Sequence, residues 1–414
     1  MGQDHKPVGI VFDPEISGRL LDSPLEKVYT MTVFERTLRS LQAAEIEQVQ
    51  IVKGSHIDTF AQIIEEKGPW DISIRFIEEN EISEINDSAD LLLLSEPLLV
   101  TPRYLKEIIT AGSEEQVLAT DPNAYVAFIG QELVKKVDTR ISDNINELKK
   151  ELKAKGVGSV EASSIGRYVC EPVPDKKSKR QATKRLIRSL RQPSDEFISR
   201  TFNRPISLAI TSVIGYTPIT ANQYTIFTGI MGLITAFILS MGGDKNFLIG
   251  GVMFHFLAVL DAGDGEIARL KFLASERGQW IDTIVDNITY VATLLGLIIG
   301  VFRSDPNHFV IYASYAGVGF LILALLSLYV YLLRHNKGGS LVNIDYSFKD
   351  DEGFYGKAMN IIQELGRRPF FSVVFMFLGI FGIMEYSLVY VSIMTFFVFA
   401  FSLQAHFQAS QKTK

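Results

Sequence analysis

The second half of the chain carries a series of long apolar runs, and these limit its fold more than any other feature. A run of about 20 apolar residues is the length that a helix needs to cross the hydrocarbon core of a bilayer. Helices satisfy their own backbone hydrogen bonds within lipid, so each run is predicted to be a transmembrane helix. The fifth run is the shortest, and a tilted neighbour would accommodate it. Six such runs occur, at about 222–241, 246–265, 281–302, 309–333, 369–384 and 386–404.

The chain before these runs has a different character. Residues 1–170 alternate strand-like segments such as VGIVF and VQIVKG with helix-like segments such as VFERTLRSLQAAE. This alternation predicts an α/β, Rossmann-like domain with a mostly parallel sheet. A basic linker is expected at 171–193, an amphipathic helix lying in the membrane interface at 194–216, and an all-α bundle of six transmembrane helices at 217–408. We therefore predict a multidomain membrane protein.

The basic residues predict how such a protein is oriented. Arg269, Lys271 and Arg277 lie between the second and third runs, and more basic residues lie between the fourth and fifth, whereas the loops GGDKN and RSDPN are nearly neutral. The positive-inside rule then places the N-terminal domain, the loop after the second run and the C-terminus in the cytoplasm of a multi-pass cell-membrane protein. The linker DKKSKRQATKRLIRSLRQ is either a solvated helix or a segment facing anionic headgroups, and the apolar runs that follow favour the second. One cysteine, Cys170, excludes an intramolecular disulfide, and no signal-peptide pattern is visible.

Four aspartates border two of the apolar runs, within DAGDGEIARLKFLASERGQWIDTIVD. Asp261 and Asp264 are three residues apart, and Asp282 and Asp286 are four apart, so each pair would share a helix face. An ionised carboxylate is costly to bury without a partner. Four acids from two helices would suit hard divalent cations, which prefer oxygen ligands. The alternative, a cluster of structural salt bridges, needs bases inside the runs, and the runs supply none.

This stretch fits the pattern D-x2-D-G-x2-A-R-x8-G-x3-D-x3-D, which resembles the signature of the CDP-alcohol phosphotransferases. The resemblance covers about residues 194–404 and implies six transmembrane helices and a homodimer. It also implies that the four aspartates hold two divalent cations, with Mg²⁺ expected and Mn²⁺ or Ca²⁺ as alternatives. Asp286 is then the expected general base that takes the proton of the acceptor hydroxyl. The matching residues are Asp261, Asp264, Gly265, Ala268, Arg269, Gly278, Asp282 and Asp286.

The resemblance extends to the residues expected to contact the nucleotide. ITANQYT resembles the family element T-P-N-x-x-T, with Ala221 in place of the proline. Small residues at Gly265 and Ala268 would let a cytidine diphosphate approach the backbone, and Arg269 would hold a phosphate oxygen. The expected nucleotide contacts are Asn222, Thr225, Asp261, Asp264, Gly265, Ala268, Arg269 and Gly278. An acceptor that carries phosphate would need bases at the cytoplasmic rim, with Arg204, Arg334, Arg367 and Arg368 as candidates.

The N-terminal domain resembles the sugar-nucleotide and cytidylyl transferases, with departures in the loop FDPEISGRLLDSPLEK. Glu15 and Ser17 stand where glycines would let the backbone approach phosphate, Lys27 is displaced, and Glu96 replaces the usual metal-binding aspartate. We expect this domain to have lost its chemistry. The alternative is an active cytidylyltransferase that makes the chain bifunctional. The domain order and linker resemble the archaeal and bacterial fused inositol-phosphate cytidylyltransferase and di-myo-inositol phosphate phosphate synthase enzymes.

These features predict a membrane enzyme that transfers a substituted phosphate group from a CDP-alcohol to an acceptor alcohol and releases CMP, in phospholipid or compatible-solute synthesis. Its expected partners are the two substrates, a lipid bilayer and a second copy of the chain, with no nucleic acid. Intramembrane acids also mark ion pathways, so a cation-binding membrane protein or transporter is the alternative. A third hypothesis makes the N-terminal domain a regulatory or docking module.

Overall fold

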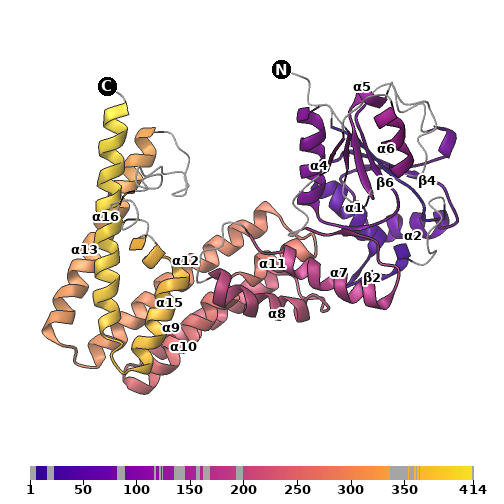
Figure 1. Cartoon of the computed structure of the whole chain (residues 1–414). Helices are drawn as coiled ribbons and strands as arrows, with labels where there is room; N and C mark the ends of the chain where they lie inside the picture. The colour runs from indigo at the N-terminus through magenta and orange to yellow at the C-terminus, as the bar shows by residue number, and fades with distance from the viewer. Residues whose placement is uncertain are drawn as a thin grey trace. The chain divides into compact units, whose positions relative to one another are not determined.

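The computed structural model describes residues 6–15, 23–81, 89–115, 118–120, 123, 125–134, 145–154, 159–161, 168–192, 199–335, 353, 359, 361–362 and 364–412, and it divides into two compact units (Figure 1). The first unit comprises Met1–Gln192, Ser212–Pro218 and Leu270–Phe272. The second comprises Pro193–Thr211, Ile219–Arg269 and Leu273–Lys414.

The first unit is built on a seven-stranded sheet with the order β10-β8-β9-β6-β1-β4-β5. β1 pairs in parallel with β4 and β6, β4 with β5, and β8 with β10, whereas β9 runs antiparallel to β6 and β8. The predicted α/β domain with a mostly parallel sheet is confirmed. The strands are β1 Val8–Val11, β4 Gln48–Val52, β5 Ser73–Ile77, β6 Leu91–Leu94, β8 Leu118–Thr120, β9 Val126–Ile129 and β10 Ser159–Glu161.

Apolar side chains form two separate buried clusters in this unit, as expected for a sheet covered on both faces. All four leucines of β6 are buried, which is typical of a central strand. One cluster includes side chains of α1 (Val33–Ala43) and α4 (Pro102–Glu115), and the other includes side chains of α6 (Ile145–Ala154). The remaining elements are η1 Ser23–Leu25, β2 Lys27–Val28, β3 Met31–Thr32, α2 Ile57–Lys67, η2 Glu79–Glu81, β7 Leu99–Val100, α5 Gln131–Val134, β11 Cys170–Glu171 and α7 Lys176–Ser189.

The described part of the second unit is helical. Its first segment is a π-helical turn, η3 (Ser199–Asn203), followed by α8 (Arg204–Ile214), whose second residue is Pro205. Proline lacks a backbone N–H and displaces the preceding turn, which explains the change of helix type there. The other described helices are α9 Ala221–Ser240, α10 Asp244–Leu260, α11 Gly263–Leu270, α12 Glu276–Arg303, α13 His308–His335, α15 Arg368–Ile380 and α16 Tyr386–Lys412.

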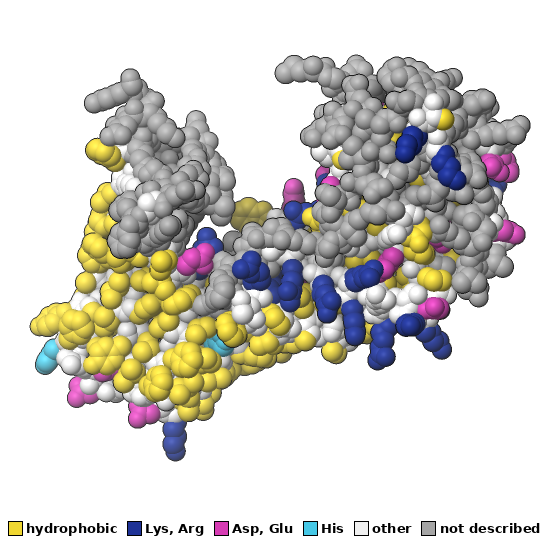
Figure 2. Space-filling view, in the orientation of Figure 1, with side chains coloured by type: hydrophobic (Ala, Val, Ile, Leu, Met, Phe, Trp, Pro, Cys, Tyr) yellow, Lys and Arg dark blue, Asp and Glu magenta, His cyan; other side chains and the backbone are white. Residues whose placement is uncertain are grey.

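Four segments in the described residues are long and apolar enough to cross a membrane, namely Ala221–Ser240, Asp244–Leu270, Glu276–Arg303 and Tyr386–Gln404. His308–Ala324 and Arg368–Ile380 are shorter apolar helices. Large apolar side chains such as Phe237, Val291 and Tyr312 are exposed, and Figure 2 shows such side chains gathered over this unit. A bundle that faces lipid explains this exposure. The count of six spans and the interfacial position of residues 194–216 stay predictions.

Small residues let α9 and α12 pack at very short range. A Cβ at Gly296 would lie 2.2 Å from the Ala236 carbonyl oxygen, and one at Gly300 would lie 1.9 Å from that of Leu239. Only glycine fits such a contact, which is typical of helix pairs in membranes. The two helices that carry Thr225 and the pair Asp282–Asp286 are therefore closely joined.

Candidate active site

The four aspartates do not lie on two continuous helix faces. α10 ends at Leu260, and a turn at Asp261 and Ala262 precedes α11, which begins at Gly263. The face expected to be shared by Asp261 and Asp264 is interrupted there. Each of these two residues instead meets one aspartate of α12.

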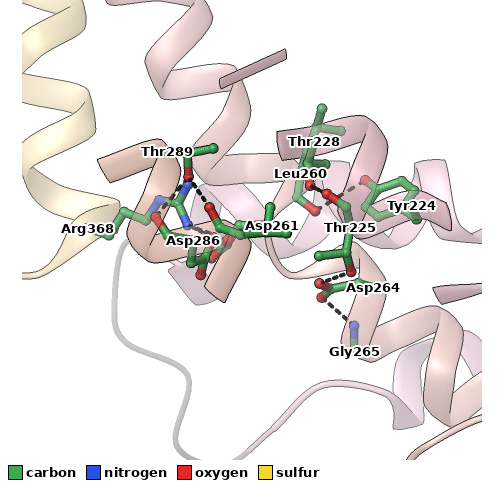
Figure 3. A network of polar contacts seen from close by, with 11 residues as sticks. Tyr224, Thr225, Thr228, Leu260, Asp261, Asp264, Gly265, Asp286, Thr289 and Arg368 are labelled. Carbon is green, nitrogen blue, oxygen red and sulfur yellow. Dashed lines mark hydrogen bonds and ion pairs between the residues drawn. The ribbon is translucent and has the colours of Figure 1, made fainter. Parts of the chain in front are cut away.

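The first acidic pair is Asp261 with Asp286, and an arginine joins it. The Arg368 Nη1 group donates to the Asp261 carboxylate, and it lies 3.3 Å from Oδ1 of Asp286 (Figure 3). The Arg368 guanidinium also lies 4.6 Å from the centre of the Tyr290 ring, and its side chain is only 15% exposed. These residues line a small cavity together with Thr228, Gly229, Gly232, Phe254, Leu257, Val285, Thr289 and Thr293.

The second acidic pair is Asp264 with Asp282, which both line one cavity. Thr225 of α9 donates its hydroxyl proton to Asp264 Oδ2 at 2.9 Å (Figure 3). The backbone N–H of Gly265 donates to Oδ1 of the same carboxylate at 2.5 Å. Asp264 is thus held by two donors, which fixes its direction.

Most of the predicted nucleotide contacts line one cavity of about 170 Å³ next to the second pair. It brings together residues from the start of α9, from α11 and from the start of α12. Among the described residues, Asp261 is the only predicted nucleotide contact that does not line this cavity. The lining residues are Ala221, Asn222, Thr225, Asp264, Gly265, Ala268, Arg269, Leu273, Ala274, Ser275, Gly278, Gln279 and Asp282.

Local sequence explains how these helix ends reach the cavity. Thr220 and Gln223 form a capping box at the start of α9, so the helix begins where predicted although Ala221 replaces the family's proline. Ser275 caps α12 by accepting from the Gly278 N–H at 3.1 Å. A Cβ at Gly278 would lie 3.2 Å from the side-chain oxygen of Asn222, so glycine keeps the two helix ends close.

Carboxylate oxygens of both pairs are suitable donors for hard divalent cations. Among the described residues, no group of three or more acidic, histidine or cysteine side chains lies close enough to hold a metal ion. The acids are instead brought together two at a time: Asp261 and Asp286 both contact Arg368, and Asp264 and Asp282 line one cavity. A cation would offset the repulsion within each pair, so the donor set fits the metal that the sequence predicts.

The arginines predicted to bind acceptor phosphate are placed differently from one another. Arg368 lies at the first acidic pair. Arg204 donates to Glu266 at 2.8 Å in a buried ion pair, and Arg367 pairs with Glu364 at 3.3 Å. The side chain of Arg334 lies outside the described residues. Neither Arg204 nor Arg367 lines the two cavities described above.

Sequence reasoning missed several residues of the site. Tyr290 follows Asp286 by four residues and Thr228 follows Thr225 by three, so helical spacing alone places them on the faces already singled out. Glu266 was also missed. Its buried carboxylate accepts from Arg204, from Ser207 at 2.5 Å and from Thr211 at 2.7 Å, which fixes α11 against α8.

In the first unit, acidic side chains occupy the start of α2. Asp13 accepts from the backbone N–H of His56 and from its Nδ1, each at 3.0 Å, and Glu15 accepts from the Ser55 N–H at 2.9 Å. Backbone N–H groups at a helix start are the ones that bind phosphate in many nucleotide sites. Glu96 is buried. Ser17 lies outside the described residues.

A family comparison shows what the helical region is similar to. Residues 218–398 match the model of the CDP-alcohol phosphatidyltransferase family. This match contains the cavity, both acidic pairs and every position of the aspartate signature. This part of the chain is therefore similar to the CDP-alcohol phosphatidyltransferase family.

The similar curated proteins share one description, "Bifunctional IPC transferase and DIPP synthase". The protein of Aquifex aeolicus is 29% identical over 126 residues, which cover 30% of this chain and 28% of that protein. That of Archaeoglobus fulgidus is 31% identical over 115 residues, with 28% and 22% covered, and that of Thermococcus kodakarensis is 30% identical over 108 residues, with 26% and 24% covered. The match therefore spans less than a third of each relative.

Among solved structures, a UDP-glucose pyrophosphorylase from Acinetobacter baumanii is similar to part of this chain. The TM-score is 0.33 and the identity 10%, with 46% of this chain and 95% of that chain covered. A similarity this weak supports no conclusion about the activity of the first unit.

Proposed function

We propose that this protein is an integral membrane enzyme that transfers a substituted phosphate group from a CDP-alcohol to an acceptor alcohol and releases CMP. The observation that carries the proposal is the cavity beside Asp264 and Asp282. It joins the two halves of the aspartate signature to Asn222 and Thr225 of a third helix. A family domain with this lining supports binding of a cytidine diphosphate there.

Each side chain of the site has a role that its chemistry suits. Arg269 holds a phosphate oxygen of the donor, and the missing side chains at Gly265 and Gly278 leave room for the nucleotide. Asp286 takes the proton of the attacking hydroxyl, as a general base. Arg368 lies beside that base and provides positive charge for a phosphate on the acceptor. Tyr290 holds the guanidinium in place from its other face.

Asp261, Asp264, Asp282 and Asp286 would hold two divalent cations, with Mg²⁺ as the expected ion. Bound there, the cations would supply positive charge against the donor diphosphate and the leaving CMP. The chain's own contribution is a preorganised set of oxygen atoms, of which Asp264 is held by Thr225 and Gly265 before substrate arrives.

The substrates belong to the class of CDP-linked alcohols and free or phosphorylated alcohols. The relatives are described as IPC transferases and DIPP synthases, so we extend inositol phosphate chemistry to this chain as the first choice. CDP-diacylglycerol is the second, because the exposed apolar surface fits a lipid donor. We also propose a homodimer in the cell membrane, with the active site on the cytoplasmic side.

We propose that the first unit has no cytidylyltransferase activity. Its Asp13 and Glu15 carboxylates already accept from backbone N–H groups at the start of α2, which are then not available to a phosphate. Their negative charge would repel that phosphate. CTP turnover by the purified full chain with the Asp286→Asn substitution would contradict this proposal.

A CMP-release assay on the purified protein tests the main proposal. Each of several CDP-alcohols is offered with a panel of alcohols, including inositol phosphates, and CMP is quantified. We expect release with at least one pair, its loss when divalent cations are removed with EDTA, and its recovery on addition of Mg²⁺. Release that persists in EDTA would contradict the metal-dependent reaction. Cation flux into proteoliposomes without CMP release would favour the transporter alternative.

A further inference from the structure

Three residues within the aspartate signature fold with the first unit. Leu270, Lys271 and Phe272 belong to the spacer between Arg269 and Gly278, yet they are part of the unit that contains the sheet. Leu270 is 1% exposed and Lys271 is 5% exposed. The residues on either side of this segment, Arg269 and Leu273, both line the cavity of the second unit. The positions of Arg269 and Leu273 in the cavity lining therefore depend on the contacts that hold residues 270–272.

Arg36 of α1 holds this segment. Its side chain is 2% exposed, and its Nε donates to the Val28 carbonyl oxygen while its Nη1 donates to that of Leu270, each at 3.0 Å. The guanidinium also lies 5.9 Å from the ring centres of Tyr29 and Phe272. Burial lowers the pKa of Arg36 to about 10, so the group stays charged at neutral pH.

The contact with Leu270 has a specific effect on α11. Leu270 is the last residue of that helix, where carbonyl groups have no partner within the helix. A positive side chain that donates there satisfies one of these carbonyls and interacts favourably with the helix dipole. Arg36 is therefore a C-terminal cap supplied from a position 234 residues away in sequence.

Other contacts of the first unit secure the same segment. Lys271 Nζ donates to the Thr217 carbonyl oxygen at 2.6 Å. A Cβ at Gly215 would lie 2.6 Å from the Tyr29 ring and 2.9 Å from the Leu270 side chain, so this glycine leaves room for both. Phe272 has a φ of 54°, a left-handed conformation that a bulky residue keeps only where its surroundings enforce it.

We infer that Arg36 is a positioning residue for the nucleotide cavity, and that the first unit serves the reaction by holding the signature spacer in place. The cap fixes the end of α11. It thereby sets the direction of Arg269, which precedes the segment, and the position at which the chain continues through Leu273 towards α12. This role needs no chemistry in the first unit. It rests on the proposed function only for its effect on nucleotide binding.

Two substitutions test the inference in the full-length protein. Arg36→Met removes the donor groups and keeps an apolar chain of similar length. Gly215→Ala adds one methyl group that displaces Tyr29 or Leu270 and leaves Arg36 intact. The matched control is Arg39→Met, because Arg39 lies on the same helix but donates to the Lys67 and Pro69 carbonyls and stacks on Trp70.

Hydrogen exchange of the peptide over residues 268–275 is the first readout, and it does not depend on activity. We expect at least tenfold faster exchange in Arg36→Met and Gly215→Ala than in the wild type or in Arg39→Met. The second readout is CMP release, where KM for the CDP-alcohol should rise about tenfold, equal to about 1.4 kcal/mol of binding, while kcat changes less than twofold. A purely structural role would lower the amount of active enzyme and leave KM unchanged.

Unchanged exchange over residues 268–275 in both variants would overturn the inference. So would equal effects in Arg39→Met. If Arg36→Met does not fold, Gly215→Ala decides the question by the same two readouts. Faster exchange in a protein whose wild type releases no CMP would retain the role of Arg36 and refute the proposed function instead.

Discussion

At the scale of single residues, the two acidic pairs differ in how firmly they are held. Asp264 is fixed by the Thr225 hydroxyl at 2.9 Å and the Gly265 N–H at 2.5 Å, whereas Asp286 has a longer contact, of 3.3 Å, with Arg368. A fixed carboxylate suits a binding role, because its oxygen atoms do not reorganise during reaction. A carboxylate with a longer contact is held less firmly, which suits proton transfer. This contrast supports the base role proposed for Asp286.

The Asp286→Asn substitution should therefore act mainly on the chemical step. The amide cannot accept the hydroxyl proton, so kcat for CMP release should fall by about 10²–10⁴. KM should change much less. Asp244→Asn, at the start of α10 and outside both cavities, is the matched control and should keep wild-type rates. Wild-type kcat in Asp286→Asn would exclude this residue as the base.

Substitutions of Arg368 should separate charge from geometry. Lysine keeps the charge but loses the planar group that reaches Asp261 and Asp286 together. We expect CMP release to fall in Arg368→Lys and to fall further in Arg368→Gln. Arg303→Gln serves as the control, since Arg303 donates to the Ser240 carbonyl at the far end of α12. Equal rates in all three variants would rule out a role for Arg368.

At the scale of helices, the close contact between α9 and α12 joins the element that carries Thr225 to the element that carries Asp282 and Asp286. Backbone against backbone leaves no side chain whose rotation could adjust the spacing. Thr225 and the two aspartates lie near the starts of these helices. The spacing between them therefore depends on Gly296 and Gly300, which contact α9 near the other ends of the two helices.

Gly300→Ala should disturb this contact directly. Its Cβ would lie 1.9 Å from the Leu239 carbonyl oxygen, and such overpacking costs about 1–3 kcal/mol. The melting temperature in detergent should fall. Gly319→Ala on α13 is the control, because its Cβ would meet no atom within 4 Å and alanine favours the helix. A higher melting temperature in both variants would contradict the tight packing of α9 on α12.

The apolar helices and much of the candidate site could be predicted from the sequence, and the features that were not predicted have physical reasons. Hydropathy located the apolar helices, and the resemblance to a family signature located many of the residues that line the cavity. The break after Leu260 was missed, because the acids at Asp261 and Asp264 fit helical spacing whether or not the helix is continuous. The contact of Arg368 with Asp261 joins residues 107 positions apart, and local periodicity contains no information on such a pairing.

At the scale of the whole molecule, the charge pattern of the loops predicts which ends of the spans face the cytoplasm. Exposed basic residues are concentrated on α7, including Lys177 and Arg180, and Figure 2 shows Lys and Arg gathered in a row. The turn between α12 and α13 has few charges by comparison. The positive-inside rule therefore predicts that α7 and this turn lie on opposite sides of the membrane.

Cysteine labelling tests this sidedness. In a Cys170→Ser background, Lys177→Cys should react with a membrane-impermeant maleimide only after the cells are opened. His308→Cys, exposed at the start of α13, should react in intact cells. The two variants control for each other, because both positions are exposed. Labelling of both in intact cells would contradict the predicted orientation.

The assignment of Leu270–Phe272 to the first unit has a consequence for dividing this chain. A cut after Gln192 separates the sequence into two pieces but does not separate the fold, because the second piece would take with it a segment whose partners stay behind. Leu270 and Lys271 would become exposed, and the Leu270 carbonyl would lose the hydrogen bond from Arg36. A chimaera or truncation should therefore keep Arg36 and residues 270–272 together, taken from the same parent protein.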